Sequence, residues 1–271
     1  MKRIGILYNP RIKPARDFSE ETAKYLTKQK LSCWQSSSQD DSEIRSHIKG
    51  TEMVLSVGGD GTVLRAARAL ARYSVPIVGV NLGKLGFLTE LKLNEAHDSL
   101  PALIAGEGWI DERAMIKVEL DGSETWHGLN DIVLGRGVRP RVINVEVIID
   151  NNTFTTYKSD GVIVATATGS TGYSLAVHGP ILYPQARDIV LNPICPHPTF
   201  DNALVLSPES VIELRVRTDH EAVLSVDGQV DIALEGEKTV KVSLSPYVTR
   251  LLRLQSRNFF YSTLVKRLVP K

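Results

Sequence analysis

Short apolar runs alternate with longer segments of helical periodicity through the first 108 residues. The apolar runs are bounded by polar residues or glycine, which is typical of buried strands. We therefore expect strands at residues 3–8, 31–35, 53–57 and 76–80, and helices at residues 14–29, 42–48, 62–72 and 94–105. Strands that alternate with helices at this spacing predict a parallel, Rossmann-like α/β sheet, and ligands bind at the ends of such strands.

The pattern changes after about residue 110, where the apolar runs become short and rich in β-branched residues. We expect strands at residues 116–120, 131–135, 142–149, 153–157, 161–165, 211–217, 222–226, 230–234 and 239–244. Asp150-Asn151-Asn152 is a predicted turn between two of them. These features predict an antiparallel, β-rich domain.

The chain is therefore expected to form two domains. Residues 1–108 form the α/β domain and residues 109–251 form the β-rich domain. Residues 258–268 return to helical spacing, so we expect the segment 252–271 to pack back on the first domain as a helix.

The overall composition excludes several classes of partner. The 271 residues carry a net charge of +1, which gives no global attraction to nucleic acid or to an anionic membrane. No apolar run approaches membrane-spanning length, and the apolar part of the N-terminus is too short for a signal peptide. The two cysteines, Cys33 and Cys195, lie far apart, and the six histidines are scattered. We expect a cytoplasmic protein without a zinc site.

The segment Gly58-Gly59-Asp60-Gly61-Thr62 carries the clearest chemical signal. It lies between a predicted strand and a predicted helix, and its glycines leave no Cβ between the backbone and a ligand. Free N–H groups at the start of a helix favour an anion such as phosphate. A carboxylate facing phosphate is costly unless it binds a metal or accepts a proton. The pattern predicts phosphoryl transfer to a hydroxyl, with Asp60 as base or Mg²⁺ ligand.

The alternative for this segment is a turn that only reverses the chain. The usual nucleotide fingerprints do not help to decide, because the chain has neither G-x-x-x-x-G-K-[ST] nor G-x-G-x-x-G.

Four further segments are candidates for ligand binding. The glycine-rich loop 81–88, which carries Lys84, either faces phosphates or is an ordinary connection. Asn130-Asp131 can contact an adenine edge or ribose hydroxyls, or can be a solvated turn. The run 166–174 is dense in hydroxyls and glycine, which suits a backbone that approaches a flat ligand closely. Asp227-Gly228-Gln229 is predicted to be a hairpin turn.

Taken together, these segments resemble the NAD kinases of the bacterial type. The matching segments follow the family's order along nearly the whole chain: residues 58–62, 81–88, 130–131, 158–161, 169–176, 195–197 and 227–229. The glycine-rich turn around Asp60 alone is less specific, because diacylglycerol-type lipid kinases and phosphofructokinases carry similar turns. The run 169–174, at its distance from Asp60, is what distinguishes NAD kinases.

The resemblance implies an activity and a fold. NAD kinases transfer the γ-phosphate of ATP, or in some members of polyphosphate, to the adenosine ribose 2′-hydroxyl of NAD and so make NADP. The implied fold is an α/β domain, a β-sandwich-like domain and a returning C-terminal helix, assembled as a homodimer or homotetramer. A divalent metal, with Mg²⁺ expected, would bind with the phosphoryl donor, and no residue is assigned as a dedicated metal ligand.

The resemblance also implies roles for individual residues. Asp60 would be the catalytic base, with Gly61 and Arg65 in the same nucleotide-contacting turn. Asn130 and Asp131 would contact the adenosine half of NAD. The rest of the NAD site would comprise Arg141, Lys158, Asp160, Thr171, Gly172, Tyr173, Ser174, Ala176 and Gln229.

Two positions depart from the family pattern. Many members have Asn-Glu where this chain has Asn130-Asp131, so the charge is kept but one methylene of reach is lost. Two glycines usually precede the proline that follows the hydroxyl-rich run, whereas this chain has His178 before Gly179. In the family, a basic residue at the position of Lys158 accompanies preference for NAD over NADH. A nearby lysine should repel the cationic nicotinamide ring of NAD, so a direct Coulomb interaction does not explain that trend. We therefore expect Lys158 to act indirectly, by pairing with an acid such as Asp160.

Two other functions remain open from the sequence. A lipid kinase would need a groove for acyl chains, and we find no exposed amphipathic helix of the membrane-binding kind. A non-catalytic NAD(P)-binding sensor would not need a base at Asp60.

Overall fold

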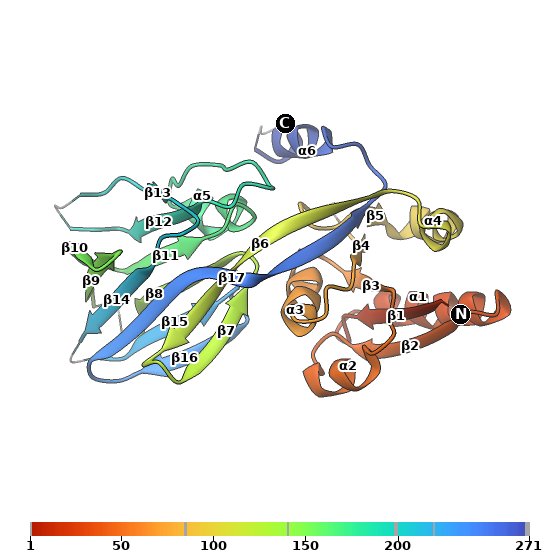
Figure 1. Ribbon diagram of the computed structural model, residues 1–271, viewed down its shortest axis with the longest axis horizontal. Helices are drawn as coiled ribbons and strands as arrows, with labels where there is room; N and C mark the ends of the chain where they lie inside the picture. The colour runs from red at the N-terminus through yellow and green to blue at the C-terminus, as the bar shows by residue number, and fades with distance from the viewer. Residues whose placement is uncertain (1, 84–85, 140, 198–199, 219, 269–271) are drawn as a thin grey trace. The chain divides into compact units, whose positions relative to one another are not determined.

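The computed structural model describes residues 2–83, 86–139, 141–197, 200–218 and 220–268. The chain forms two compact units, residues 1–112 with 249–271, and residues 113–248 (Figure 1). Two strands, β6 (Trp109–Leu120) and β17 (Lys238–Arg253), contribute residues to both units.

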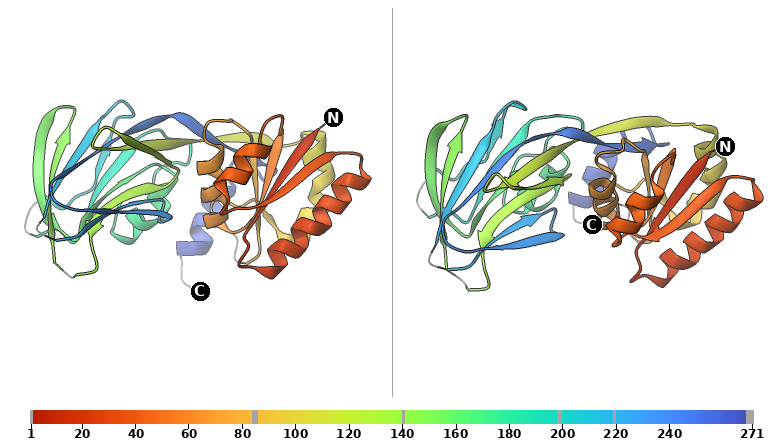
Figure 2. Two further views of the ribbon diagram at one scale, coloured as in Figure 1. Left: turned by 90° about the horizontal axis from the view of Figure 1, so that it is seen from below. Right: turned by 60° about the horizontal axis from the view of Figure 1, so that its bottom comes forward.

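The first unit contains a parallel sheet whose strands follow the order β17-β4-β3-β1-β2. The predicted strands are confirmed as β1 (Arg3–Tyr8), β2 (Ser32–Ser37), β3 (Met53–Gly58) and β4 (Ile77–Asn81). The predicted helices are confirmed as α1 (Lys13–Lys28), α2 (Asp41–His47), α3 (Asp60–Leu70) and α4 (Leu93–Ala105). The sequence did not predict β5 (Leu91–Lys92), which pairs with β4. Figure 2 shows α1 lying along the sheet, where it contacts β1 and β2.

The core of this unit fixes the turn that follows β3. All six residues of β3 are buried, and α3 buries one face, including Val63, Ala66 and Leu70. A strand and a helix that are both anchored in the core hold the short connection between them in a single position. That connection is the glycine-rich turn around Asp60.

The second unit is a sandwich of two sheets. One sheet has the order β13-β12-β11-β8-β15-β16, and the other contains β10-β9-β14-β17, with β6 beside β17 and β7. The strands not yet given are β7 (Glu124–Gly128), β8 (Asp131–Arg136), β9 (Ile143–Ile149), β10 (Asn152–Ser159), β11 (Gly161–Ala165), β12 (Ile189–Ile194), β13 (Leu204–Leu206), β14 (Ile212–Arg217), β15 (Ala222–Val226) and β16 (Val230–Leu234).

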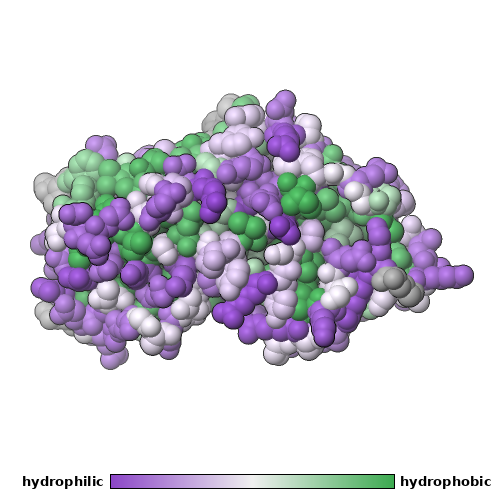
Figure 3. All heavy atoms as spheres, viewed as in Figure 1, coloured by the Kyte–Doolittle hydropathy of each residue, from purple (hydrophilic) through white to green (hydrophobic). Residues whose placement is uncertain are grey.

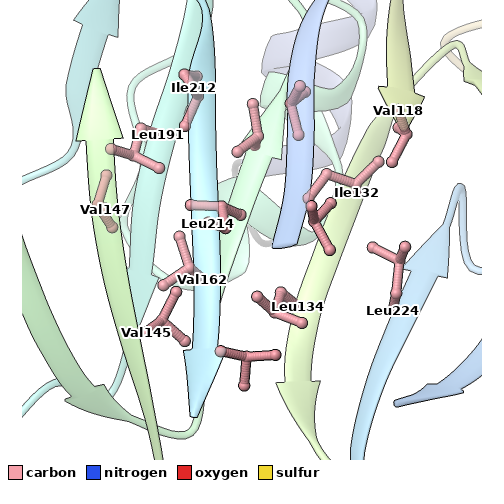
Figure 4. Close-up of a cluster of buried hydrophobic side chains, with 14 of the residues drawn as sticks. Val118, Ile132, Leu134, Val145, Val147, Val162, Leu191, Ile212, Leu214 and Leu224 are labelled. Carbon is pink, nitrogen blue, oxygen red and sulfur yellow. The ribbon is translucent and has the colours of Figure 1, made fainter. Parts of the chain in front are cut away.

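Apolar side chains from the two sheets pack against each other between them. Leu134 and Val162 come from one sheet, and Val145 and Leu214 come from the other (Figure 4). The predicted antiparallel β-rich domain is confirmed. The sequence did not predict β7, β12 or β13, and it ended β17 at residue 244 rather than at Arg253.

Two predicted turns of this unit are confirmed. Asp150 and Asn151 have φ values of 49° and 66°, and Asp227 and Gly228 have φ values of 53° and 61°. Positive φ at both central residues is the requirement of the tight hairpin turn that matches strand twist. These turns join β9 to β10 and β15 to β16.

The C-terminal helix α6 (Phe259–Leu268) confirms the predicted helix and belongs to the first unit. Its Phe260 ring lies 6.2 Å, between centroids, from the ring of Phe87. Figure 3 shows charged and polar residues interspersed with apolar ones on the face viewed. Within the described residues, no helix combines the length and the apolar character needed to cross a membrane.

Candidate active site

The carboxylate of Asp60 is held by backbone groups of a distant loop. Oδ1 accepts the N–H groups of Leu88 (3.1 Å) and Thr89 (3.2 Å), and Oδ2 accepts the N–H of Phe87 (2.8 Å). A carboxylate offers about four lone-pair positions, so these bonds leave about one position, on Oδ2. Asp60 is therefore an oriented acceptor at the first position of α3.

Glycine at position 86 makes this close approach possible. A Cβ on Gly86 would overlap the Asp60 carboxylate. The neighbouring Thr89 hydroxyl accepts the Gly86 N–H at 2.8 Å and a proton from the Asn81 amide at 3.2 Å, so the loop is also held from its other side. The glycine-rich loop 81–88 thus receives the Asp60 side chain. The predicted phosphate contact of Lys84 lies outside the described residues.

Positive charge gathers next to the Asp60 turn. Burial and the charges of Arg68 and Arg11 lower the pKa of Arg65, which lies one turn after Gly61. Arg68 also contacts Asp41 at 3.8 Å, whereas Arg65 makes no hydrogen bond or ion pair with another described residue. A guanidinium near two other cations at a helix start is a suitable partner for an anion.

In the second unit, Asn130 and Asp131 lie at the start of β8 and line a cavity of about 330 Å³. Tyr173, exposed to 46%, lines the same cavity. The structure therefore brings three of the predicted NAD-site residues together. The remaining lining residues are Val133, Ser225, Asp227 and Gly228.

Asp227 fixes the backbone of this pair. Its carboxylate accepts the N–H groups of Leu129 (2.9 Å), Asn130 (2.7 Å) and Asp131 (3.1 Å). Asp131 is 6% exposed, and burial, followed by the charge of Asp227, raises its pKa to about 7. The predicted hairpin turn is thus also a support for the Asn130-Asp131 segment, which the sequence did not show.

The hydroxyl-rich run is packed closely against Asn130. The Thr166 hydroxyl donates to the carbonyl of Leu129 at 2.6 Å, and a Cβ on Gly169 would overlap the carbonyl of Asn130. Thr171 is the last residue of a short 3-10 turn that begins at Gly169, and Gly172 follows it. The expected close backbone approach therefore exists, and it is made to the Asn130 segment.

Ser174 and Ala176 belong to the short helix α5 (Tyr173–Ala176) and differ in exposure. Ser174 is fully buried, and its carbonyl accepts a proton from the Asn192 amide at 3.2 Å, whereas Ala176 is exposed. Ser174 thus supports the loop instead of lining the cavity.

The expected pair between Lys158 and Asp160 is wrong. Asp160 pairs with Arg136, with Nε and Oδ1 at 2.9 Å, and Lys158 is exposed. Lys158 belongs to β10, whereas Asp160 lies beyond the end of that strand, just before β11 of the other sheet, so no strand holds the two side chains on a common face. Arg141 donates to His220 at 2.9 Å, and Gln229 closes the hairpin turn after Asp227. In the described part of the chain, none of these four lines the cavity.

His178 adopts a left-handed conformation with a φ of 64°. This explains why glycine suits the position, since glycine reaches positive φ without steric cost. We expect His178→Val to lower the free energy of unfolding by about 1–2 kcal/mol, because a β-branched residue is strained there. His178→Gly is expected to leave it unchanged or slightly higher. Urea denaturation of both variants is the measurement, and equal losses in the two would show that the side chain matters rather than the backbone.

Comparison with known proteins identifies the family of this chain. The family model for the ATP-NAD kinase N-terminal domain matches residues 11–108, and the model for the ATP-NAD kinase C-terminal domain matches residues 129–254. The NAD kinase of Dehalococcoides mccartyi strain BAV1 is 41% identical, over 98% of this chain and 96% of the relative. The NAD kinase of Chloroflexus aurantiacus strain J-10-fl is 38% identical, over 99% of each chain.

Solved structures show the same fold. Yeast NADH kinase complexed with NADH gives a TM-score of 0.86 at 21% identity, covering 100% of this chain and 89% of that chain. An NAD kinase from Archaeoglobus fulgidus in complex with ATP gives a TM-score of 0.81 at 24% identity, covering 98% and 100%. With both family domains matched and relatives similar along their full length, the chain belongs to the NAD kinase family.

Proposed function

We propose that this chain transfers the γ-phosphate of ATP to the adenosine ribose 2′-hydroxyl of NAD, with Asp60 as the base. Family membership gives the activity, phosphorylation of NAD, and the roles of the residues are our proposal. The observation that carries the proposal is the oriented Asp60 carboxylate at the start of α3. A carboxylate fixed in a turn whose helix N-terminus favours phosphate suits proton removal from a hydroxyl that attacks a phosphoryl group.

The free position on Asp60 defines how the proton would move. Oδ2 accepts one backbone N–H, from Phe87, and can accept the proton of the 2′-hydroxyl on its other side. The amide groups at the start of α3 and the cation Arg65 would stabilise the negative charge of the phosphates. Gly61 is exposed, and a Cβ there would meet no atom within 4 Å, so the backbone is accessible from outside.

A divalent metal would bind mainly through the phosphates of the donor. Among the described residues there is no group of three or more histidine, cysteine or acidic side chains that could hold a metal ion. Mg²⁺ usually keeps several waters and takes few protein ligands, so binding through the phosphates leaves the one free acceptor position of Asp60 to the 2′-hydroxyl proton. When bound, Mg²⁺ would neutralise charge on the transferred phosphoryl group.

The cavity beside Asn130 and Asp131 suits the adenosine half of NAD. The Asn130 amide offers two donors and one acceptor, the Asp131 carboxyl offers acceptors, and the exposed Tyr173 ring offers a flat apolar face. Both polar side chains lack a hydrogen bond to another described residue, so they are available to a ligand. We further propose that the other residues of the predicted NAD site contact or support the rest of NAD: Arg141, Lys158, Asp160, Thr171, Gly172, Ser174, Ala176 and Gln229.

One assay tests the reaction. The protein is incubated with Mg²⁺, ATP and NAD, and NADP is detected with an NADP-specific dehydrogenase. Replacing ATP by polyphosphate in parallel identifies the donor. Binding of NAD without any NADP would favour a non-catalytic sensor, and phosphorylation of diacylglycerol instead of NAD would favour a lipid kinase.

We propose that the chain assembles as a homodimer or homotetramer. Among the described strands, the two sheets of the sandwich end at β13, β16 and β10, and Val205 on β13 is 51% exposed. Open edges are normally covered, because unpaired backbone groups pair with other chains. Light scattering at micromolar concentration should give a mass of at least two chains, and a strictly monomeric mass would contradict the proposal. The substrates and the two free cysteines favour a cytoplasmic location.

A further inference from the structure

A buried ionic cluster lies beside the loop that holds Asp60. The guanidinium of Arg253 contacts Glu90 and Asp111, each at 3.2 Å, and the three side chains are 8%, 1% and 2% exposed. Two of the elements that supply the cluster, β6 and β17, are the strands shared by the two units. Buried ion pairs are weak contributors to stability, because removing the charges from water is costly. Stability alone is therefore a poor reason for this cluster.

Arg253 binds the same peptide groups that bind Asp60. Its Nη2 donates to the carbonyl of Phe87 at 3.3 Å, and its Nη1 donates to the carbonyl of Leu88 at 3.1 Å. The N–H ends of these two peptide groups, on Leu88 and Thr89, are the two donors to Asp60 Oδ1. Each of these two peptide groups therefore links the two side chains directly: its C=O end binds Arg253 and its N–H end binds Asp60.

Glu90 ties the loop to the end of β17. Its carboxylate accepts the N–H groups of Leu254 (2.8 Å) and Gln255 (2.6 Å) in addition to Arg253. Asp111 holds the Nε side of the guanidinium. Every side of the Arg253 fork is therefore fixed, and the fork in turn fixes two carbonyl groups of the loop.

We propose that Arg253, oriented by Glu90 and Asp111, is a positioning residue for Asp60. A cation at a carbonyl oxygen polarises the peptide group, which strengthens donation by its N–H. Arg253 therefore both locates the two N–H donors and strengthens their bonds to Asp60 Oδ1. With Oδ1 held in this way, Oδ2 is oriented to accept the proton of the 2′-hydroxyl. The inference rests on the proposed function of Asp60 as the base.

The first test is Arg253→Lys, with Arg250→Lys as its matched control. Lysine keeps the charge but replaces the planar fork by a single ammonium group, which cannot bind two carbonyls and two carboxylates together. Arg250 lies on the same strand and pairs with Glu112 at 3.0 Å on the surface. We expect Arg253→Lys to lower kcat roughly 10- to 100-fold, since small displacements of a catalytic group have effects of this size. KM for NAD and for ATP should change less than about threefold, and Arg250→Lys should keep the kcat of the wild type.

A second variant tests the same role in a protein that is expected to fold. The triple change Arg253→Met, Glu90→Gln and Asp111→Asn removes all three charges together, so no buried charge is left unpaired. We expect a cooperative thermal transition and the same loss of kcat. A folded form of either variant with the kcat of the wild type would overturn the proposal, as would a rise in KM that accounts for the whole loss.

A double-mutant cycle with Asp60→Asn identifies the route of the effect. If Arg253 acts through Asp60, Arg253→Lys should cause almost no further loss of kcat once Asp60 is replaced. If Arg253→Lys lowers the kcat of the Asp60→Asn variant by the same factor as it lowers the kcat of the wild type, Arg253 acts elsewhere and the proposal is wrong. A large loss of kcat in Asp60→Asn, together with no loss in Arg253→Lys, would overturn the role of Arg253 and leave Asp60 as the base. Wild-type kcat in Asp60→Asn would overturn the base assignment itself, and this inference with it.

Discussion

Asp60→Asn is expected to lower kcat by roughly 10²- to 10⁴-fold, the usual contribution of a positioned general base. Asparagine has nearly the same shape but cannot accept a proton from the 2′-hydroxyl at neutral pH. The variant should still fold, because an amide oxygen can accept the N–H groups of Leu88 and Thr89 that now bind Oδ1. Steady-state kinetics with ATP and NAD give the measurement.

The structure also predicts a cost to the loop in this variant. An amide nitrogen facing the N–H of Phe87 would leave that donor unpaired, which costs about 1–3 kcal/mol of unfolding free energy. The control is Asp17→Asn, which changes an exposed carboxylate on α1 and should alter neither kcat nor stability. A near wild-type kcat for Asp60→Asn would remove Asp60 as the base. Recovery of activity at higher Mg²⁺ concentration would instead assign Asp60 as a metal ligand.

The sequence predicted the elements that carry the Asp60 turn because their signals are local. A fully apolar run and a following amphipathic segment are enough to place β3 and α3. The helix begins at Asp60, two residues before the predicted start. Gly59 is the capping residue, and its N–H lies 3.4 Å from the Thr62 hydroxyl, so the turn is already part of the helix.

The missed strands lack such local signals. Strand β12 contains Asn192-Pro193 in its interior, and proline normally argues against an internal strand position. Here Pro193 lies opposite Val162, while the buried Asn192 amide donates to Ser174 and Val177. Strand β7 is mostly polar and half exposed, so it has no clear alternation. Strand β12 is completed by β11 and β13, whereas β7 pairs with the end of β6, which directly precedes it across a short turn.

The same distinction separates the site residues that were predicted from those that were not. Asp60 and the Asn130-Asp131 pair were recognised because each belongs to a short motif. The carboxylate of Asp227 binds N–H groups 96 to 98 positions away, and Arg253 contacts the loop before Glu90 from 165 positions away. Neither contact has a local signature. The sequence identified the side chains that we propose to contact a ligand, and it missed the side chains that hold them in place.

Asp131 should make the stability of the protein depend on pH. In the folded chain, burial and the charge of Asp227 raise the pKa of Asp131 from its ordinary 3.8 to about 7. As pH rises from 3.8 to 7, the unfolded chain loses this proton while the folded chain keeps it. The stabilisation from Asp131 is therefore fully present below pH 3.8 and is lost as pH rises to about 7. The slope is about 1.4 kcal/mol for each pH unit.

Asp131→Asn isolates this effect, since asparagine has no carboxyl group to titrate. Other carboxylates also change stability with pH, so the quantity to compare is the difference in unfolding free energy between the variant and the wild type. Between pH 5 and pH 8 that difference should shift by roughly 2–3 kcal/mol in favour of the variant. Denaturation in urea at pH 5, 6.5 and 8 measures it, and Asp98→Asn, an exposed change on α4, should show no such shift.

The same titration should reach the proposed NAD site. Above pH 7 the ionised Asp131 accepts hydrogen bonds only, which suits ribose hydroxyls or an adenine amino group, whereas the protonated form also donates. KM for NAD is therefore expected to fall as pH rises through about 7 in the wild type and to change less in Asp131→Asn. If the two proteins show parallel stability curves and parallel KM profiles, Asp131 is already ionised in the folded chain.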